Sequence, residues 1–218
     1  MDYFEEFGFK TPKQERSKRT IEDIKQAIEE LARAEVLFGT GELEAISTRD
    51  LADHSGHAIG TIFHHFKKFD DIYVYVFMRR RSKSISKVAA IINQHPADQP
   101  LSVLTRNVVN TMIGELSRPP RKVLIFFMNR YLKQAKIKTL LNLETDVLIP
   151  LWIIAGQRNN TQTFLKLNED ELRLRIRTIH SMTMMPFFED DPIAGTPAHI
   201  EMAVNIANQL FSVPDLSE

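Results

Sequence analysis

Hydrophobic residues recur at helical spacing along most of this chain. The first such stretch consists of Ile21, Ile24, Ile28, Leu31, Leu37 and Phe38. Its spacing of three or four residues places apolar side chains on one face of an α-helix. Gly39 and Gly41 follow, and glycine commonly ends a helix. We therefore expect a first helix over about residues 20–38.

Two short helices and a longer one are expected next. Ser47 is followed three residues later by Asp50, and a hydroxyl and an acid at this spacing resemble a helix-starting capping box. Because Gly56 follows soon afterwards, this helix must be short. A third helix is expected over residues 58–65 and a fourth over residues 70–92, where two acids favour the N-terminus of the fourth.

The helical pattern resumes after a break at residues 95–100, which contain two prolines and form the expected hinge. Helices are expected over residues 101–116, 123–141, 143–158, 169–186 and 197–213, with a kink at Pro150 and a proline-rich loop over 186–197. No strand pair, internal repeat or long low-complexity segment is evident. The predicted fold class is all-α.

The composition excludes several classes of protein. Hydrophobic residues make up 43% and charged residues 26% of the 218 residues, and there is no cysteine. Disulfides, thiol chemistry and cysteine-ligated metals are therefore excluded. The most apolar run, residues 147–156, is shorter than the roughly 20 residues that span a bilayer. No secretory signal opens the chain, so we expect a cytoplasmic protein without a membrane partner.

The formal net charge is zero, but basic residues concentrate in two runs. Residues 10–19 hold five basic residues and one acid, and residues 67–81 hold five basic residues and two acids. An acidic stretch lies between them. A phosphate backbone responds to local charge rather than to the total. The runs become informative only if the fold places both on one side; otherwise they form a solvated mixed-charge surface.

Residues 47–66 carry the clearest functional signal. They form two short helices joined by a tight turn at Gly56, and four apolar residues would hold the pair together: Leu51, Ala52, Ile62 and Phe66. This is the plan of a helix-turn-helix, whose second helix enters the major groove of DNA. A unit with this shape that serves packing alone is the alternative.

The stretch resembles the DNA-binding module of TetR-family regulators. The resemblance includes the family's Gly-Thr-(Leu/Ile)-aromatic core, here Gly60-Thr61-Ile62-Phe63, and extends through Phe66 to Asp70-Asp71-Ile72. It covers about residues 20–77. The family implies an N-terminal basic arm over residues 1–17, a three-helix DNA-binding domain with a helix-turn-helix over 18–81, and a larger C-terminal helical ligand-binding and dimerisation domain over 82–218.

Through the resemblance, ten residues become candidates for contacts with double-stranded DNA: Thr48, Ala58, Ile59, Gly60, Thr61, Phe63, His64, His65, Lys67 and Lys68. Thr61 can donate a hydrogen bond to a phosphate, and Gly60 lets the backbone approach closely. Ile59 and Phe63 could contact thymine methyl groups, and His64 could bind a base edge. The lysines would add attraction that is independent of base sequence.

The family also implies a homodimer on a near-palindromic operator, joined through the last two long helices, about residues 169–186 and 197–213. Their stripes of Ile176, Ile179, Ala203, Ala207 and Leu210 are compatible with such packing. Repression that is relieved by a small, largely apolar effector is the family default. The candidate ligand residues are Phe126, Phe127, Trp152, His180 and Met184, although packing in the core explains each of them equally well.

Four positions depart from the family pattern. Phe63 replaces a common tyrosine, Phe69 replaces a common lysine, His57 replaces an apolar residue, and Ala58 replaces a capping serine. Phe63, Phe69 and the zero net charge motivate a second hypothesis, in which a binding or scaffolding protein has kept the fold and lost operator recognition. A helical enzyme is a third hypothesis.

The residues offer no catalytic site or cofactor. No nucleophile–base pairing, phosphate loop or paired-carboxylate motif with recognisable spacing is evident. His54, His57, His64 and His65 cluster in the sequence, but no carboxylate completes a familiar ligand pattern with them. We therefore expect no enzyme activity, no cofactor and no metal, and we interpret these histidines as surface or DNA-facing residues.

Overall fold

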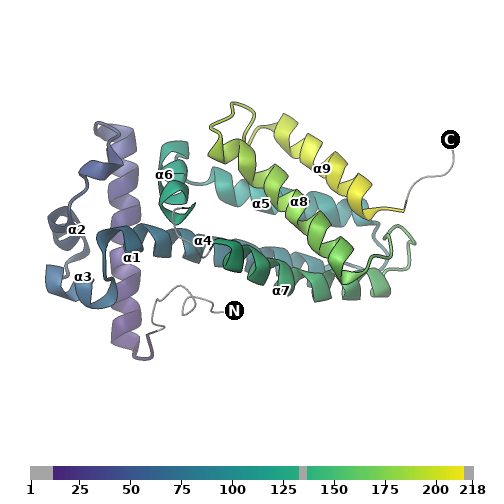
Figure 1. Cartoon of the computed structure of the whole chain (residues 1–218), viewed down its shortest axis with the longest axis horizontal. Helices are drawn as coiled ribbons and strands as arrows, with labels where there is room; N and C mark the ends of the chain where they lie inside the picture. Colours follow the sequence, from purple (N-terminus) through teal and green to yellow (C-terminus); the bar gives the residue numbers. More distant parts are fainter. Residues whose placement is uncertain (1–11, 133–136, 214–218) are drawn as a thin grey trace. The chain divides into compact units, whose positions relative to one another are not determined.

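The computed structural model describes residues 12–132 and 137–213, with the side chains of residues 128–141 outside the description. The described part is helical, and the all-α prediction is confirmed. The chain forms two compact units (Figure 1). The N-terminal unit comprises residues 1–82 and 119–137, and the C-terminal unit comprises residues 83–118 and 138–218.

The N-terminal unit is built around α1. Its elements are α1 (Glu15–Phe38), the short 3-10 helix η2 (Leu43–Ala45), α2 (Thr48–Ser55), α3 (Ile59–His65), the first part of α4 (Phe69–Gln94) and α6 (Arg121–Leu132). Helices α2 and α6 both pack on α1, and α3 packs on α2 (Figure 1). Ile24 and Ile28 of α1 are fully buried, as their spacing predicts.

Helix α2 begins and ends where its local sequence predicts. The Oγ of Ser47 accepts a hydrogen bond from the Asp50 backbone N–H at 3.2 Å, and the Asp50 Oδ2 accepts from the Ser47 N–H at 2.8 Å. This is a complete capping box, although Asp is shorter than the usual Glu. The Ser47 hydroxyl also donates to Asp50 Oδ2 at 2.6 Å, and this bond, followed by the one from the Ser47 N–H, lowers the pKa of Asp50. Gly56 ends the helix at φ 70°, in the left-handed region that favours glycine.

Several helix boundaries differ from the prediction. Helix α1 begins at Glu15 rather than near residue 20, because its first turn is charged and gives no hydrophobic signal. Arg16, Lys18 and Arg19 therefore lie on this helix and do not form part of a separate arm. Residues 1–11 of the predicted arm lie outside the described residues. The predicted division near residue 142 is wrong, because helix α7 (Ile137–Arg158) runs through it.

The C-terminal unit packs α5 (Leu101–Ser117) against α8 (Glu169–Phe188) and α9 (Pro197–Phe211), which also contact each other (Figure 1). The unit also contains the second part of α4 and most of α7 (Ile137–Arg158). Helix α7 continues through Pro150, and α8 continues two residues beyond Pro186. Among the described helices, none combines the length and apolar character needed to cross a bilayer.

The apolar stripes predicted for a dimer interface are mostly internal. Ile176, Ile179, Ala203 and Ala207 are all buried within the C-terminal unit, where α5, α8 and α9 pack together. Leu210 is half-buried. The assignment of these stripes to a subunit interface is therefore wrong. Sequence periodicity marks a buried face, but it does not say whether the same chain or a second copy covers that face.

Two glycine substitutions test the helix-turn-helix geometry. Because Gly56 has φ 70°, we expect Gly56→Ala to lower the free energy of unfolding by about 1–2 kcal/mol, the cost of a left-handed backbone for a residue with a Cβ. Gly60 is helical, and no atom lies within 4 Å of an added Cβ. We expect Gly60→Ala to leave stability unchanged or raise it by up to about 1 kcal/mol. Urea denaturation measures both, and equal effects would contradict this geometry.

Candidate nucleic-acid interface and ligand cavity

Helix α3 has one buried side and one open side. Ile62 and Phe66 are buried, and the ring of Phe66 meets Tyr75 of α4 edge to face, with centroids 5.5 Å apart. Ile59 and Phe63 keep 44% and 42% of their surface exposed. Burial of two apolar anchors therefore fixes the helix and leaves the rest of its surface open to a partner.

The ten predicted DNA-contact residues lie on α2, on α3 or in the turns directly before and after α3. Those on the open surface are Ala58, Ile59, Gly60, Phe63, His64, Lys67 and Lys68. Thr48, Thr61 and His65 are half-buried. The backbone N–H of Lys68 donates to Asp71 Oδ2 at 2.9 Å, which fixes the turn into α4. The helix-turn-helix thus gathers the whole predicted set.

The basic residues of the second run, residues 67–81, do not contribute equally to the surface. Lys67 and Lys68 are exposed, but Arg80 pairs with Glu29 of α1 at 2.9 Å and Arg81 is buried. Arg80 and Arg81 are therefore largely withdrawn from the surface, whereas Arg79 is exposed. The available positive charge of this run lies mainly beside the C-terminus of α3.

Two histidines connect the helix-turn-helix to α1. His54 Nε2 donates to Glu30 Oε2 at 2.9 Å, and His57 Nε2 donates to Asp23 Oδ2 at 3.0 Å. Hydrogen bonds from Gln26 and then His54 lower the pKa of Glu30. Sequence analysis missed these pairs, because the partners stand far apart along the chain. Across the described residues, no three His, Cys, Asp or Glu side chains gather as a group that could hold a metal.

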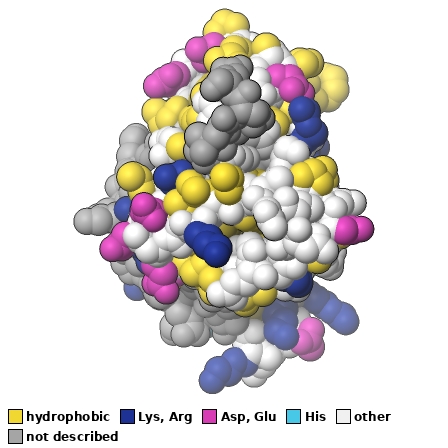
Figure 2. Space-filling model, turned by 90° about the vertical axis from the view of Figure 1, so that its right-hand side faces the viewer, with side chains coloured by type: hydrophobic (Ala, Val, Ile, Leu, Met, Phe, Trp, Pro, Cys, Tyr) yellow, Lys and Arg dark blue, Asp and Glu magenta, His cyan; other side chains and the backbone are white. Residues whose placement is uncertain are grey.

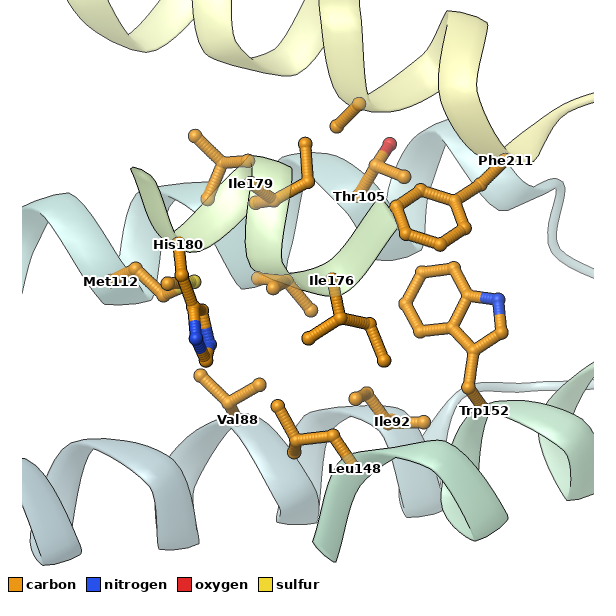
Figure 3. Close-up of a pocket in the computed structure, with 13 residues that line it drawn as sticks. Val88, Ile92, Thr105, Met112, Leu148, Trp152, Ile176, Ile179, His180 and Phe211 are labelled. Atoms are coloured by element: carbon orange, nitrogen blue, oxygen red, sulfur yellow. The ribbon is translucent and has the colours of Figure 1, made fainter. Parts of the chain in front are cut away.

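The C-terminal unit contains a small apolar cavity of about 30 Å³. Figure 3 shows Ile176 near its centre, with Trp152 facing Phe211 on one side and His180 facing Val88 on the other. Helices α4, α5, α7, α8 and α9 all contribute to the lining. The polar side chains that line it are those of Thr105 and His180. The cavity holds little more than water, for which about 10–15 Å³ is the minimum.

The predicted ligand residues separate into two places. Trp152 and His180 line the cavity. Met184 is buried one turn beyond His180 but does not line it. Phe126 and Phe127 belong to the N-terminal unit, where their ring centroids lie 4.9 and 5.3 Å from that of Tyr73. The two phenylalanines are therefore core residues of the other unit.

Comparison with known proteins agrees with this geometry. Residues 31–76, which run from α1 through the helix-turn-helix into α4, match the sequence profile of the bacterial regulatory proteins of the tetR family. The segment that carries the helix-turn-helix is therefore similar to the tetR family. No curated protein is significantly similar to it in sequence.

Solved structures extend the TetR-family fold over the C-terminal unit. A TetR-family transcriptional regulator of Haemophilus influenzae has a TM-score of 0.55 and 15% identity, covering 92% of this chain and all of that one. The multidrug binding protein EbrR, complexed with imidazole, has a TM-score of 0.56 and 18% identity, covering 92% of each chain. The fatty acid degradation regulator FadR of Bacillus halodurans has a TM-score of 0.56 and 18% identity, covering 88% and 97%.

The structure accounts for two of the departures from the TetR-family pattern. Phe69 is half-buried and meets Tyr73 edge to face at 5.5 Å between centroids, so it joins the packing of α4. His57 occupies a position where the family has an apolar residue, and it forms the ion pair with Asp23 instead. Phe63 remains on the open surface of α3, and Ala58 is the N-cap of that helix without a side-chain hydrogen bond.

The titration of His65 tests the surroundings of α3. Burial lowers the pKa of His65, and the neighbouring imidazoles of His64 and His57 lower it further. We expect His64→Ala to raise the pKa of His65, while burial keeps it below the ordinary value of about 6.5. NMR titration of the imidazole protons measures this pKa. Ile59→Ala, an uncharged change on the same helix, is the control and should leave it in place.

The sign of the stability effect follows from the same shift. Because the folded protein binds a proton at His65 less readily than the unfolded chain does, stability from this residue falls as the pH drops below about 6.5. A pKa of His65 at or above the ordinary value of about 6.5 would contradict the described burial.

Proposed function

We propose that this chain is a cytoplasmic, sequence-specific DNA-binding regulator that acts as a homodimer, and that it represses transcription until a small, largely apolar ligand releases it. The observation that carries the proposal is the open side of α3. The helix buries Ile62 and Phe66 while a threonine, two histidines and two large apolar side chains remain at or near its surface. Such a helix matches the recognition helix of a helix-turn-helix.

The open surface of α3 offers each kind of contact that DNA needs. His64 can donate to a base edge, and the exposed side chains of Ile59 and Phe63 can contact thymine methyl groups. Thr61 and Thr48 can donate hydrogen bonds to phosphates. Lys67 and Lys68 supply attraction without base preference. Gly60 has open space around it, which allows the backbone to approach DNA closely.

The outer faces of α8 and α9 support the homodimer. Leu174 and Met185 of α8 are 68% and 41% exposed, and Met202 and Ile206 of α9 are 55% and 36% exposed. They stand at helical spacing on the sides opposite the buried stripes. Two copies of this four-residue surface could pack as a four-helix bundle. A two-fold axis would then present two α3 helices to a near-palindromic operator.

Helix α4 is the proposed link between ligand and DNA. Its first part buries Ile72 and Val76 in the N-terminal unit, and Val88 and Ile92 of its second part line the cavity. A ligand that enlarges the cavity would bind one arrangement of α4 better than the other. That difference in affinity is what allows a ligand to shift a two-state equilibrium.

DNA selectivity is the first test. Duplexes selected from random DNA by the purified protein should bind at least about 100-fold more tightly than scrambled duplexes, as measured by fluorescence anisotropy across a salt series. Thr61→Ala combined with His64→Ala should abolish this margin, and Gly60→Ala should reduce it without loss of stability. Thr111→Ala, a half-buried helical threonine of the C-terminal unit, is the control. Lys67→Ala should weaken selected and scrambled duplexes alike.

Two outcomes would overturn this part of the proposal. If selection enriches no sequence although the protein is folded and dimeric, the chain is a scaffolding protein that has kept the fold. If the double variant keeps its selectivity, α3 is not the recognition helix.

The oligomeric state is a separate test. Met202→Glu combined with Ile206→Glu should convert a dimer into a folded monomer, because charge on the exposed face of α9 would be desolvated in the interface. Sedimentation velocity measures the mass. Leu37→Glu is the control, since Leu37 is 61% exposed on α1 in the N-terminal unit. A wild-type monomer, or an unaltered dimer in the double variant, would rule out this interface.

A further inference from the structure

A surface groove lies at one end of the C-terminal unit, separate from the small cavity. Its volume is about 1000 Å³, and residues at the end of α7, the loop before α8, the start of α8 and Val213 line it. Its walls include Ile153, Phe164, Leu165 and Leu172. Figure 2, which faces the side that carries the end of α9, shows hydrophobic side chains at the surface in several groups among polar and charged ones.

The wall formed by the loop before α8 is held firmly by hydrogen bonds. The Leu101 N–H donates to Thr163 Oγ1 at 2.9 Å, and the Asn160 N–H donates to the Ala97 carbonyl at 2.9 Å. On the other side, the Leu165 N–H donates to the Phe211 carbonyl at 2.8 Å. The loop is thereby tied to both the start of α5 and the end of α9. The groove is a built feature rather than a gap beside a loose segment.

Trp152 is the partition between the groove and the cavity. It lines both spaces, whereas Phe164 lines the groove alone and Phe211 the cavity alone. The ring centroid of Trp152 lies 4.4 Å from that of Phe211 and 6.1 Å from that of Phe164. Figure 3 shows the indole standing against the Phe211 ring at the end of the cavity. A change of the Trp152 rotamer would join the two spaces.

We infer that this joined space binds an elongated, single-chain amphiphile with an anionic head group, such as a fatty carboxylate. The apolar chain passes Trp152 and enters the cavity toward Ile176, and the head stays in the groove. This inference names the ligand class for the proposed regulator and rests on that proposed function.

The shape and the charge of the two spaces select this ligand class. The cavity alone is far smaller than the 300–1,000 Å³ of typical ligand pockets, so a bulky ring system does not fit, whereas a narrow alkyl chain could enter once Trp152 and the residues around the cavity move apart. Among the described groove-lining residues, Lys166 is the single charged one, and it is exposed. Gln157 and Gln162 add exposed amides nearby. One cation among amides favours a carboxylate head.

The protein contains its own reporter, because Trp152 is the single tryptophan of the chain. Octanoate, decanoate and dodecanoate, each below its micelle concentration, should produce a saturable change in tryptophan emission. Each added pair of methylenes should tighten binding by about tenfold. Butyrate should have no effect, because it is too short to pass Trp152. This series uses the unchanged protein.

Matched variants locate the alkyl chain of the bound ligand. A Cβ at Gly156 would lie 3.4 Å from Phe164 Cδ1, so Gly156→Leu fills the groove and should weaken dodecanoate binding at least about tenfold. Gly114→Leu makes the same change on α5 in open space and should leave binding unchanged. Ile176→Phe fills the cavity and should weaken dodecanoate more than octanoate. Lys166→Gln should weaken dodecanoate and leave dodecanol unaffected.

The outcomes separate this inference from the proposed function. Absence of a saturable emission change with dodecanoate, absence of chain-length dependence, or equal affinity in Gly156→Leu and Gly114→Leu would overturn the inference. Unaltered binding in Ile176→Phe would overturn the passage into the cavity. Selective DNA binding is measured without the amphiphile, so it can fail or succeed independently of the tryptophan signal.

Discussion

Everything that this protein could present to DNA depends on the burial of one side of a very short helix. Helix α3 has seven residues, far fewer than the roughly 12–15 below which an isolated helix is marginal in water. It exists because Ile62 is fully buried and Phe66 is almost so. The partners of these anchors come from α2 and α4, which in turn need α1. The open surface of α3 is thus a product of the whole N-terminal unit rather than of its own sequence.

The hydrogen-bonded pairs of His54 with Glu30 and of His57 with Asp23, which join the helix-turn-helix to α1, belong to the same constraint. Exposed pairs usually add little stability, about 0–1 kcal/mol, and those of His54 and His57 are partly exposed. Their value lies in position. The pair of His54 holds the end of α2, and the pair of His57 holds the turn before α3. Both pairs therefore fix the segment that sets the orientation of α3.

The sequence predicts the helix-turn-helix well because its signals are local. The capping residues Ser47 and Asp50, the glycine at position 56 and the anchors of α3 all act within a few residues of one another, and the boundaries of α2 and α3 agree with the prediction to within about one residue, the usual disagreement between assignments. The pairing of His57 with Asp23 spans 34 residues. No local pattern encodes such a contact.

Prediction fails where the sequence marks burial without naming the partner. Phe126 and Phe127 have the composition of a ligand pocket, but they pack with Tyr73 in the N-terminal unit. Ile176 and Ala207 have the spacing of an interface, but α5 and its neighbours cover them. In both cases the apolar pattern is correct and the assigned partner is not, because periodicity defines a face and only the tertiary fold chooses what covers it.

The same consideration explains why a nearly closed cavity suits a switch better than an open one. A preformed pocket can bind its ligand equally well in both states of a protein, and equal affinity shifts no equilibrium. The cavity beside Trp152 is too small to accept a chain without rearrangement. Binding of the proposed amphiphile would therefore favour the arrangement in which Trp152 and the helices around it have moved. Val88 and Ile92 of α4 form part of that wall. Part of the free energy needed to open the cavity would therefore go into displacing α4, the helix that continues into the N-terminal unit.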